Sequence, residues 1–321
     1  MVIGMLLQTD SLAVILSLVI HQVLADGQCV TKGTTPEIRE LVLGRCIDYQ
    51  TNINPGAFCV NGVSTRRNCS ALADLFISAF SFQPACNVSY SRYDDFIQAA
   101  NIDVPSGQGM FWSGVYGVVQ MYSNHGQRAT VLEDTLIGYM VDGLQFCAQT
   151  NEPGITYDED CSGFGQRDNC THNAEYSFWA MASKNFASHV NGNVQVMLNA
   201  SLDQPFRDLS FFSTWEVPNM NASQISNVNI LMVHIPGQVI RSNCDSDSIS
   251  MLKKRLKDRN ISSSCEDSPR GPQSILCVDH PREKECSEEK ATSTSSHLVF
   301  TGAHIAVMIA VLTVFSLQFT N

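Results

Sequence analysis

Positive charge is scarce in this 321-residue chain. Lysine and arginine together number 20 against 31 aspartates and glutamates, which gives a formal net charge of −11. An acidic surface does not attract nucleic acid or anionic lipid, so partners of these classes are excluded. A substrate that carries phosphate would have to be held mainly by backbone N–H groups and hydroxyls. The hydrophobic content of 44% is that of an ordinary globular protein with one or two domains.

Cysteine pairs with the spacing of a zinc site are missing, although the chain contains twelve cysteines. This number is far above cytosolic usage and indicates disulfides formed in the secretory pathway. We expect no metal site and no bound cofactor. In that compartment, Asn-x-Ser/Thr sequons would carry glycans at exposed positions. They begin at Asn68, Asn87, Asn169, Asn199, Asn221 and Asn260.

Basic residues are also missing near Met1, where a signal peptide usually has them. The apolar stretch from Ser11 to Leu24 is nevertheless too short to span a membrane comfortably, and it ends in the small-residue pattern Val23-Leu24-Ala25. This pattern predicts a signal peptide over residues 1–25. An uncleaved anchor or a buried helix is the alternative.

No lysine or arginine follows the apolar tail from Leu298 to Phe319, whereas a spanning helix usually has basic residues on its cytoplasmic side. Small polar residues at 291–296 precede the tail. Residues 291–321 therefore predict a glycosylphosphatidylinositol (GPI) attachment signal, with a single-pass helix as the alternative. The mature protein would then be lipid-anchored on the extracellular face of the cell membrane or in the lumen of a vesicle.

Helical periodicity dominates the first half of the chain. Thr34-Thr35-Pro36-Glu37 predicts a helix start with a hydroxyl cap, a proline in the first turn and an acid near the positive helix end. Ser70 is expected to cap a stronger helix that extends to Phe80. Further helices are predicted at 96–100, 132–143 and 178–186, with Glu133 and Asp134 in the first turn of the second of these.

The pattern changes to strands after residue 190. Alternation at 194–198, a continuous apolar run at 227–235 and the segment 274–278 predict three strands. A helix capped at 245–247 is predicted between the last two strands. We interpret the basic residues near its C-terminal end as solvated side chains that interact favourably with the helix dipole, and not as an anion site.

These elements predict an α+β fold that is rich in disulfides. A mainly helical lobe would occupy residues 26–190, and residues 191–290 would form a strand–helix–strand lobe with a small parallel sheet flanked by helices. Two such lobes leave a cleft between them. No internal repeat or low-complexity linker is visible before Ala291.

One carboxylate among large aromatics marks the stretch 210–219. Glu216 lies near Phe211, Phe212 and Trp215 and precedes Pro218. A carboxylate in apolar surroundings is costly to ionise unless something nearby benefits from its charge. The alternative is a strand edge with the glutamate in solvent. In residues 110–116 and 132–140, too, an aromatic or a carboxylate lies at the start of an apolar run.

Together these motifs resemble the ADP-ribosyl cyclase/cyclic ADP-ribose hydrolase family, whose members consume NAD. The combination is FWSGVY from Phe111, LEDTLIGYM from Leu132, SFWAMAS from Ser177 and FFSTWEVPN from Phe211. The resemblance extends from about Pro36 to about Cys286. It implies the same two-lobed architecture with the site in the cleft, and it makes NAD the substrate rather than a cofactor.

The resemblance assigns the chemistry to acidic residues. Cleavage of the bond between nicotinamide and ribose passes through an oxocarbenium-like state, which a nearby negative charge stabilises. Glu216 matches the carboxylate that supplies this charge and holds the ribose hydroxyls. Glu133 matches the acid that contacts the nicotinamide amide and influences which product forms, and Asp142 matches a second contact to the leaving ring. Nine residues cannot place two acids on one face of an ideal helix, so either the helix begins after Glu133 or Asp142 contributes little.

Other matched residues would bind the substrate. Trp112 and Trp179 match paired aromatics that position it, with two core tryptophans as the alternative. Ser113, Ser183 and the backbone at Phe212 match phosphate contacts.

Two positions bear on affinity and product choice. Gly114 stands where some family members have a basic residue, which puts tight diphosphate binding in doubt. Phe211, five residues before Glu216, matches an aromatic of members that mostly cyclise. An alternative places Phe211 in the core, with Phe212 facing the site.

Spacing alone does not give the disulfide connectivity. Cys29 and Cys59 would pair as an additional bridge near the N-terminus. The resemblance suggests the other pairs: Cys46–Cys69, Cys86–Cys170, Cys147–Cys161, Cys244–Cys265 and Cys277–Cys286.

The predicted activity is cleavage of NAD to cyclic ADP-ribose and ADP-ribose, with base exchange on NADP to make NAADP as a further reaction. A cell-surface receptor or adhesion protein that has kept the fold with little catalysis is the alternative. The intact set of Trp112, Glu133, Trp179 and Glu216 favours the enzyme, because a receptor has no physical need for all four. A homodimer is a candidate assembly.

Overall fold

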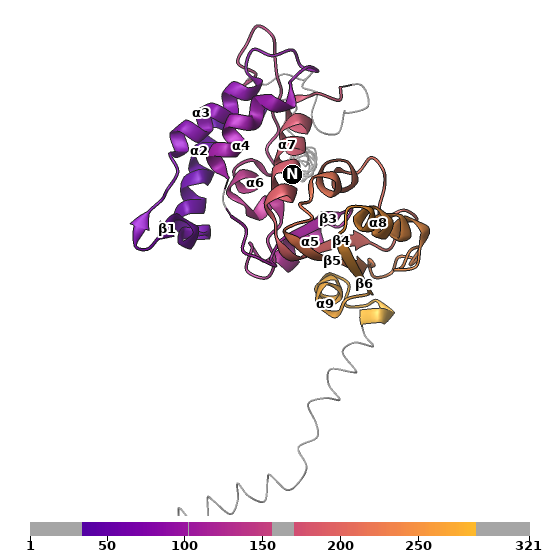
Figure 1. Cartoon of the computed structure of the whole chain (residues 1–321). Helices are drawn as coiled ribbons and strands as arrows, with labels where there is room; N and C mark the ends of the chain where they lie inside the picture. Colours follow the sequence, from indigo (N-terminus) through magenta and orange to yellow (C-terminus); the bar gives the residue numbers. More distant parts are fainter. Residues whose placement is uncertain (1–33, 102, 156–169, 287–321) are drawn as a thin grey trace, which may run out of the picture. The chain divides into compact units, whose positions relative to one another are not determined.

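The computed structural model describes residues 34–101, 103–155 and 170–286 (Figure 1). The predicted signal peptide and attachment signal lie outside these residues. No helix in the described ranges is long and apolar enough to cross a membrane. The chain divides into two compact units: the first takes its residues from Met1–Asp103 and Leu132–Phe186, and the second from Val104–Val131 and Ala187–Asn321. Each unit is described by itself.

The first unit is mainly helical. Two short strands, β1 (Cys59–Val60) and β2 (Val63–Ser64), form an antiparallel hairpin. Short 3-10 or π turns precede or follow several helices: η1 (Tyr49–Ile53), η2 (Pro55–Phe58), η3 (Tyr90–Tyr93) and η4 (Leu132–Asp134). The α-helices are α2 (Ile38–Asp48), α3 (Cys69–Phe80), α4 (Asp94–Ala100), α6 (Leu136–Val141) and α7 (Ala174–His189), of which α7 continues into the second unit.

Buried phenylalanines hold these helices together. The ring of Phe76 on α3 lies 4.9 Å from that of Phe146 and 5.7 Å from that of Phe178 on α7. Phe80 and Phe96 are equally buried. Such edge-to-face contacts add to the gain from apolar burial, so this cluster is the core of the unit.

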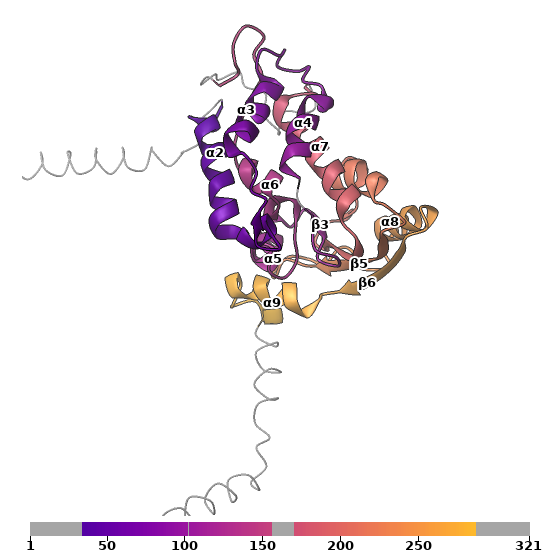
Figure 2. The ribbon, with the colours of Figure 1, turned by 60° about the vertical axis from the view of Figure 1, so that its left-hand side comes forward.

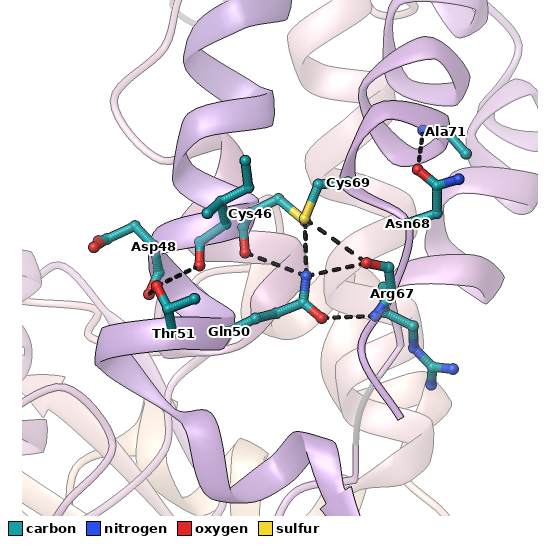
Figure 3. The surroundings of a disulfide bond; sticks show 9 residues. Cys46, Asp48, Gln50, Thr51, Arg67, Asn68, Cys69 and Ala71 are labelled. Carbon is teal, nitrogen blue, oxygen red and sulfur yellow. Dashed lines mark hydrogen bonds between the residues drawn. A yellow bond between two sulfur atoms is a disulfide. The ribbon is translucent and has the colours of Figure 1, made fainter. Parts of the chain in front are cut away.

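Helices α2 and α3 lie side by side and are linked at one end by a disulfide (Figures 1 and 2). Cys46 bonds to Cys69, and the buried Gln50 lies beside this bond (Figure 3). The Gln50 Oε1 accepts from the Arg67 backbone N–H at 2.6 Å, while its Nε2 donates to the Arg67 carbonyl at 3.3 Å. One side chain therefore fixes the backbone that leads into α3.

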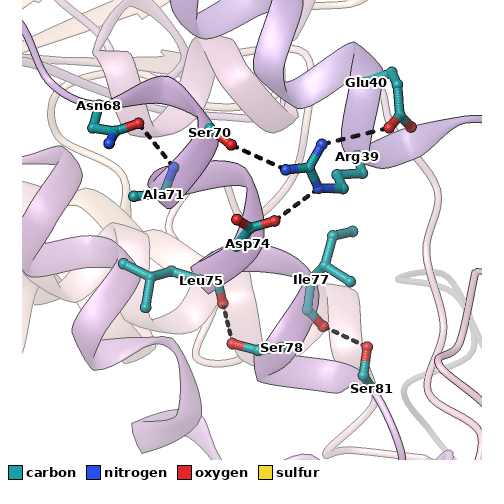
Figure 4. A network of polar contacts seen from close by, with 10 residues as sticks. All are labelled: Arg39, Glu40, Asn68, Ser70, Ala71, Asp74, Leu75, Ile77, Ser78 and Ser81. Carbon is teal, nitrogen blue, oxygen red and sulfur yellow. Dashed lines mark hydrogen bonds and ion pairs between the residues drawn. The ribbon is translucent and has the colours of Figure 1, made fainter.

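A surface network joins the same two helices further along (Figure 4). The Arg39 Nε donates to Asp74 at 2.7 Å, and its Nη2 donates to Ser70 at 3.1 Å. Asp74 is exposed, so we expect this ion pair to contribute little to stability.

The helix starts differ from the predictions. Asn68, not Ser70, caps α3, because its side chain accepts from the Ala71 N–H at 3.1 Å. The hydroxyls of Thr34 and Thr35 do not cap α2: Thr34 donates to a carbonyl at residue 154, and Thr35 accepts from the N–H of residue 145. Both predictions were wrong: Asn68 takes the place of Ser70 as the cap of α3, and the two threonine hydroxyls are engaged by a distant segment, so α2 has no side-chain cap.

The second unit is built on a four-stranded sheet in the order β3-β4-β5-β6, and every pairing in it is parallel. The strands are β3 (Met110–Ser113), β4 (Gly192–Asn199), β5 (Ile225–Val233) and β6 (Ser262–Asp267); the helices are α5 (Tyr116–Ser123), α8 (Asp247–Asp258) and α9 (Arg270–Asp279); the short turns are η6 (Phe212–Glu216) and η7 (Val217–Asn219). The prediction of an α+β fold with a small parallel sheet is confirmed.

A hydrophobic cluster joins the sheet to α5 and α9. Met110, Met197 and Leu231 come from three adjacent strands, while Val119 lies on α5 and Leu276 on α9. Because side chains alternate along a strand, the neighbours of Met197 and Leu231 point to the opposite face, where they are also buried. Burial on both faces is the usual state of a parallel sheet.

The predicted strand at 274–278 is wrong, because these residues belong to helix α9. Leu276 is buried while Val278 is 75% exposed, which suits one face of a helix and not a buried strand. The last strand is β6, whose sequence SSSCED is polar and largely exposed at the edge of the sheet. An edge strand of this composition has no apolar alternation by which to recognise it.

Three basic side chains of α8 and that of Arg259, which follows the helix, bond to protein groups. The pairs are Lys253 with the Cys244 carbonyl, Lys254 with Asp258, Arg255 with Asp208, and Arg259 with the Met220 carbonyl. The interpretation that they form no anion site stays a prediction.

Four predicted disulfides are present: Cys46–Cys69, Cys86–Cys170, Cys244–Cys265 and Cys277–Cys286. Cys147 is also disulfide-bonded, and its predicted partner Cys161 lies outside the described residues. Cys59 is exposed and has no disulfide partner among the described residues. Its predicted partner Cys29 lies outside the described residues as well, so that pairing stays a prediction.

The sequons differ in burial. Asn68, Asn87 and Asn260 are exposed and Asn221 is half-buried, whereas Asn199 is only 9% exposed. Asn169 lies outside the described residues. Glycosylation of these sites stays a prediction.

Candidate active site

Glu216 is buried at the end of the π-helical turn η6, with 8% of its surface exposed. The 3-10 turn η7 follows directly, with Pro218 in its first positions. The alternative of a strand edge with Glu216 in solvent is therefore wrong. Single π-helical turns occur frequently at functional sites, because they shift the side chains that follow out of the α-helical register.

Packing of Phe212 connects this turn to the sheet. The Phe212 ring lies 5.7 Å from that of Phe111 on β3 and 5.8 Å from that of Phe206. Phe212 is 1% exposed, whereas Phe211 is half-buried. The alternative in which Phe211 belongs to the core is wrong, because Phe212 occupies that place.

Strand β3 carries the next two predicted residues. Trp112 pairs with Met197 and Ser113 with Leu198 in the parallel register with β4. Trp112 is half-buried, with its ring 5.5 Å from that of Tyr116. Ser113 is buried at the carboxyl end of the strand. In parallel sheets, ligands bind at the carboxyl ends of the strands, so this is a favourable place for a contact to the substrate.

Gly114 ends β3 in a left-handed conformation, with φ +71°. A Cβ at this position would lie 3.3 Å from the Leu202 Cδ1, so a larger residue would be both strained and crowded. The local backbone therefore favours glycine at this position.

Asn199 is a site neighbour that the sequence did not identify. Its Nδ2 donates to the Gly114 carbonyl at 3.1 Å, and its Oδ1 accepts from the Ser201 N–H at 2.8 Å. It therefore ties together the carboxyl ends of β3 and β4. In the sequence it was visible only as a sequon, which carries no signal of this role.

In the first unit, Glu133 lies in the short 3-10 turn η4, ahead of helix α6. The prediction that places it in the first turn of that helix was wrong. Thr135 separates the two elements: its hydroxyl accepts from the Gly138 N–H at 3.2 Å and donates to the Leu132 carbonyl at 2.6 Å. Of the two alternatives left open by the nine-residue spacing, the structure shows the first, a helix that begins after Glu133.

Gly138 allows this turn to approach the helix closely. A Cβ on Gly138 would lie 2.6 Å from the Glu133 Cα and would also collide with the Leu132 carbonyl. Asp142 follows the last residue of α6, and its carbonyl accepts from the Arg45 Nη1 at 2.6 Å. Both predicted acids of the first unit thus flank one short helix.

Trp179 and Ser183 lie four residues apart on α7, so they share one face of that helix. Ser183 is buried, while Trp179 is half-buried with its ring 5.0 Å from that of Phe178. Both tryptophans are partly exposed, but Trp112 also packs against the hydrophobic cluster of the second unit, so their role as substrate contacts stays a prediction. Glu175, one turn before Trp179, is buried and accepts from the Phe146 N–H at 2.9 Å, a role that periodicity did not reveal.

Two tyrosines of the first unit have raised pKa values. Burial raises the pKa of Tyr49 to about 12, and the nearby Asp134 contributes to the shift. Burial also raises the pKa of Tyr139 to about 12, while the hydroxyl of Tyr139 lowers the pKa of Asp48. No group of acidic, histidine or cysteine side chains in the described ranges could hold a metal ion.

Comparison with known proteins places the chain in a family. Residues 35–286 match the ADP-ribosyl cyclase family. The ADP-ribosyl cyclase/cyclic ADP-ribose hydrolase of Aplysia californica is 34% identical over 258 residues, covering 78% of this chain and 87% of that protein. The ADP-ribosyl cyclase/cyclic ADP-ribose hydrolase 1 of Oryctolagus cuniculus is 32% identical over 276 residues, covering 86% and 89%.

The fold agrees with this match. A solved structure of Aplysia cyclase complexed with substrate NGD and product cGDPR has a TM-score of 0.71 at 34% identity, covering 79% of this chain and 98% of that one. The chain belongs to the ADP-ribosyl cyclase family, and it is an enzyme of that class.

Proposed function

We propose that the protein cleaves the nicotinamide–ribose bond of NAD and that Glu216 is the catalytic carboxylate. The observation that carries this proposal is the burial of Glu216 on a π-helical turn, in the stretch that matches the family motif. A carboxylate with little access to water interacts strongly with a developing positive charge.

In the first step the bond between the anomeric carbon and the pyridine nitrogen breaks. The electron pair leaves with the nitrogen, so the pyridinium becomes neutral nicotinamide and needs no proton donor. Positive charge develops on the ribose, and the Glu216 carboxylate stabilises it. Trp112 and Trp179 would position the substrate, and Ser113, Ser183 and the backbone at Phe212 would contact its phosphates.

The ribosyl cation can react with either of two nucleophiles, and each gives its own product. Water adds to the anomeric carbon and loses a proton to give ADP-ribose, whereas the substrate's own adenine closes the ring to give cyclic ADP-ribose. Half-buried Phe211 suits stacking on a folded nucleotide, so we propose substantial cyclisation, with Glu133 and Asp142 as contacts to the leaving ring. Base exchange on NADP is a further reaction: nicotinamide leaves, and added nicotinic acid captures the corresponding phosphorylated cation through its ring nitrogen to give NAADP.

The deciding experiment replaces Glu216 by glutamine in secreted, tail-truncated protein. Glu216→Gln keeps the shape, removes the charge and should lower NAD turnover by roughly 10²–10³, the scale of one lost electrostatic contact to the transition state. Glu266→Gln, at an exposed position on β6, removes an equal charge and should leave turnover unchanged.

A folded Glu216→Gln protein with full turnover would show that another group acts. No turnover by the unsubstituted protein would favour the alternative of a receptor or adhesion protein. That alternative also explains the disulfides, but it gives no reason for a buried carboxylate at Glu216.

We also propose that the mature protein is GPI-anchored on the extracellular or lumenal side of a membrane. The composition of residues 291–319 supports this. A homodimer remains a candidate, which sedimentation of the tail-truncated protein would test.

A further inference from the structure

The end of helix α2 and its C-cap residue contact the segment that carries Glu133 and Asp142 at three places. Arg45 and Asp48 lie on α2, and Tyr49 caps it at the start of η1 with helical backbone angles, so the spacing i, i+3 and i+4 places the three side chains on one side. None of these three belongs to the motifs by which the site was recognised.

The three contacts are distributed along the segment. The Tyr49 hydroxyl donates to the Asp134 carbonyl at 2.8 Å, at the start of the segment. The Tyr139 hydroxyl donates to Asp48 Oδ2 at 2.6 Å in its middle. The guanidinium of Arg45 donates to the carbonyl of the last residue, Asp142, at 2.6 Å. Helix α2 and its C-cap residue therefore contact the segment near both ends and at its centre.

The first of these contacts is closest along the chain to Glu133. Glu133 lies in a turn of three residues, and the carbonyl that Tyr49 holds belongs to the residue directly after it. Tyr49 is 1% exposed, and its ring lies 5.4 Å from that of Tyr139, so packing fixes the position of its hydroxyl. Because a short turn has few internal bonds of its own, an external anchor can set its orientation.

We propose that Tyr49 is a positioning residue: through the Asp134 carbonyl it sets the orientation of Glu133, and thereby the partition between cyclisation and hydrolysis. The product effect rests on the proposed role of Glu133. Arg45 has the equivalent relation to Asp142 at the other end of the segment.

The test uses Tyr49→Phe in the full mature protein, because this change removes the hydroxyl and keeps the ring. Tyr93→Phe is the matched control: Tyr93 is also fully buried in the first unit, and its hydroxyl donates to a backbone carbonyl, that of Ala174, at 2.9 Å. Both variants lose one buried hydrogen bond, but only the first loses a bond to the segment 132–142.

Two quantities are measured in each variant. Amide hydrogen exchange within 133–142 should be about threefold to tenfold faster in Tyr49→Phe and unchanged in Tyr93→Phe, the scale of one lost hydrogen bond. The ratio of cyclic ADP-ribose to ADP-ribose should change by about threefold or more in Tyr49→Phe, in the same direction as in Glu133→Gln.

The double variant Tyr49→Phe/Glu133→Gln decides whether the two residues act as one. If Tyr49 acts through Glu133, the double variant has the product ratio of Glu133→Gln alone. An additive change, or a Tyr49→Phe ratio equal to that of Tyr93→Phe while Glu133→Gln differs, would overturn the proposal.

The outcome for Glu133→Gln alone separates the two proposals. If that change leaves the product ratio as it was, the proposed role of Glu133 fails, and exchange then decides the positioning role. Faster exchange in Tyr49→Phe than in Tyr93→Phe supports Tyr49 as the anchor of the turn, and equal exchange overturns it.

Discussion

Phe211 and Phe212 are adjacent and chemically identical, yet their surroundings differ. Phe212 packs against Phe111 and Phe206 and is buried, so it anchors the turn that ends in Glu216. Phe211 keeps part of its ring accessible. Under the proposed function, the accessible part of Phe211 would stack on a folded nucleotide.

We expect Phe211→Thr to shift the products toward ADP-ribose at similar total NAD turnover, because a small hydroxyl residue admits water to the cation. Chromatography of both products measures the shift, and the fluorescent cyclic product of the guanine analogue of NAD gives a second readout. Leu209→Thr is the control, since Leu209 is 79% exposed. An unchanged ratio in Phe211→Thr would assign product choice elsewhere, first of all to Glu133.

Tyr49 also makes stability depend on alkaline pH. Burial raises its pKa from 10.0 to about 12, so the folded protein keeps a proton that the unfolded chain releases. Its contribution is fully present below pH 10 and is lost as the pH rises toward 12, by at most roughly 3 kcal/mol. Denaturant unfolding at a series of alkaline pH values should show a shallower decline in Tyr49→Phe than in the unsubstituted protein. Tyr116→Phe, at an exposed position, should retain the full decline.

At the scale of elements, Gly138 has a role that its position in a helix does not reveal. The Cβ of an alanine at this position would overlap the backbone of Leu132 and Glu133 and would force that backbone away from α6. We expect Gly138→Ala to destabilise the protein by about 1–3 kcal/mol, as overpacking does, and to alter product choice through Glu133.

Gly44→Ala is the matched control for Gly138→Ala, and we expect it to have the opposite effect on stability. Gly44 is inside helix α2, and a Cβ there would have nothing within 4 Å. Alanine should therefore stabilise the protein by about 0.5–1 kcal/mol, because it restricts the unfolded chain and favours the helix. Thermal unfolding of the two variants measures both effects, and a destabilised Gly44→Ala or an unaffected Gly138→Ala would contradict this account.

Periodicity predicted several elements that bury a clear apolar face, but it missed strand β3 and helix α5, which are short although they carry buried apolar residues. Helix α3 and strands β4 and β5 follow their patterns of burial, so their positions were predictable. Polar β6 was invisible, and the apolar residues of α9 were mistaken for a strand. Helix caps were predicted from sequence neighbours, but hydroxyls near a helix start have several partners to choose from in the folded chain.

The candidate site was predicted by motif and not by physical pattern alone. Composition and spacing identified an acidic, disulfide-rich secretory protein, and an isolated carboxylate among aromatics. The roles of Glu216 and Glu133 came from the resemblance. Tyr49, Asn199 and Gly138 were beyond either route. Tyr49 and Asn199 bond to the backbone of residues remote in sequence, and Gly138 lies against the backbone of a separate turn, so only folded geometry shows these contacts.

At the scale of the whole molecule, the disulfides indicate the kind of compartment in which the protein folds. In the described part of the chain, Cys46–Cys69 and Cys86–Cys170 lie within the first unit, and Cys244–Cys265 and Cys277–Cys286 within the second. The bridge from Cys86 closes a loop with a sequence separation of 84, so it restricts the unfolded chain more than the others do. Four such bonds are typical of an oxidising compartment, which supports the proposed extracellular or lumenal location.

The proposed GPI anchor also concerns the whole chain. The small polar residues 291–296 followed by the apolar run 298–319 have the composition of a signal that is exchanged for a lipid. We expect phosphatidylinositol-specific phospholipase C to release NAD-cleaving activity from the surface of cells that express the full chain. The control variant appends several lysines and arginines after Asn321, because basic residues on the cytoplasmic side favour a spanning helix. That variant should stay on the membrane after the same treatment. If the unaltered protein is retained to the same extent as the control, the apolar run spans the membrane and the lipid anchor is wrong.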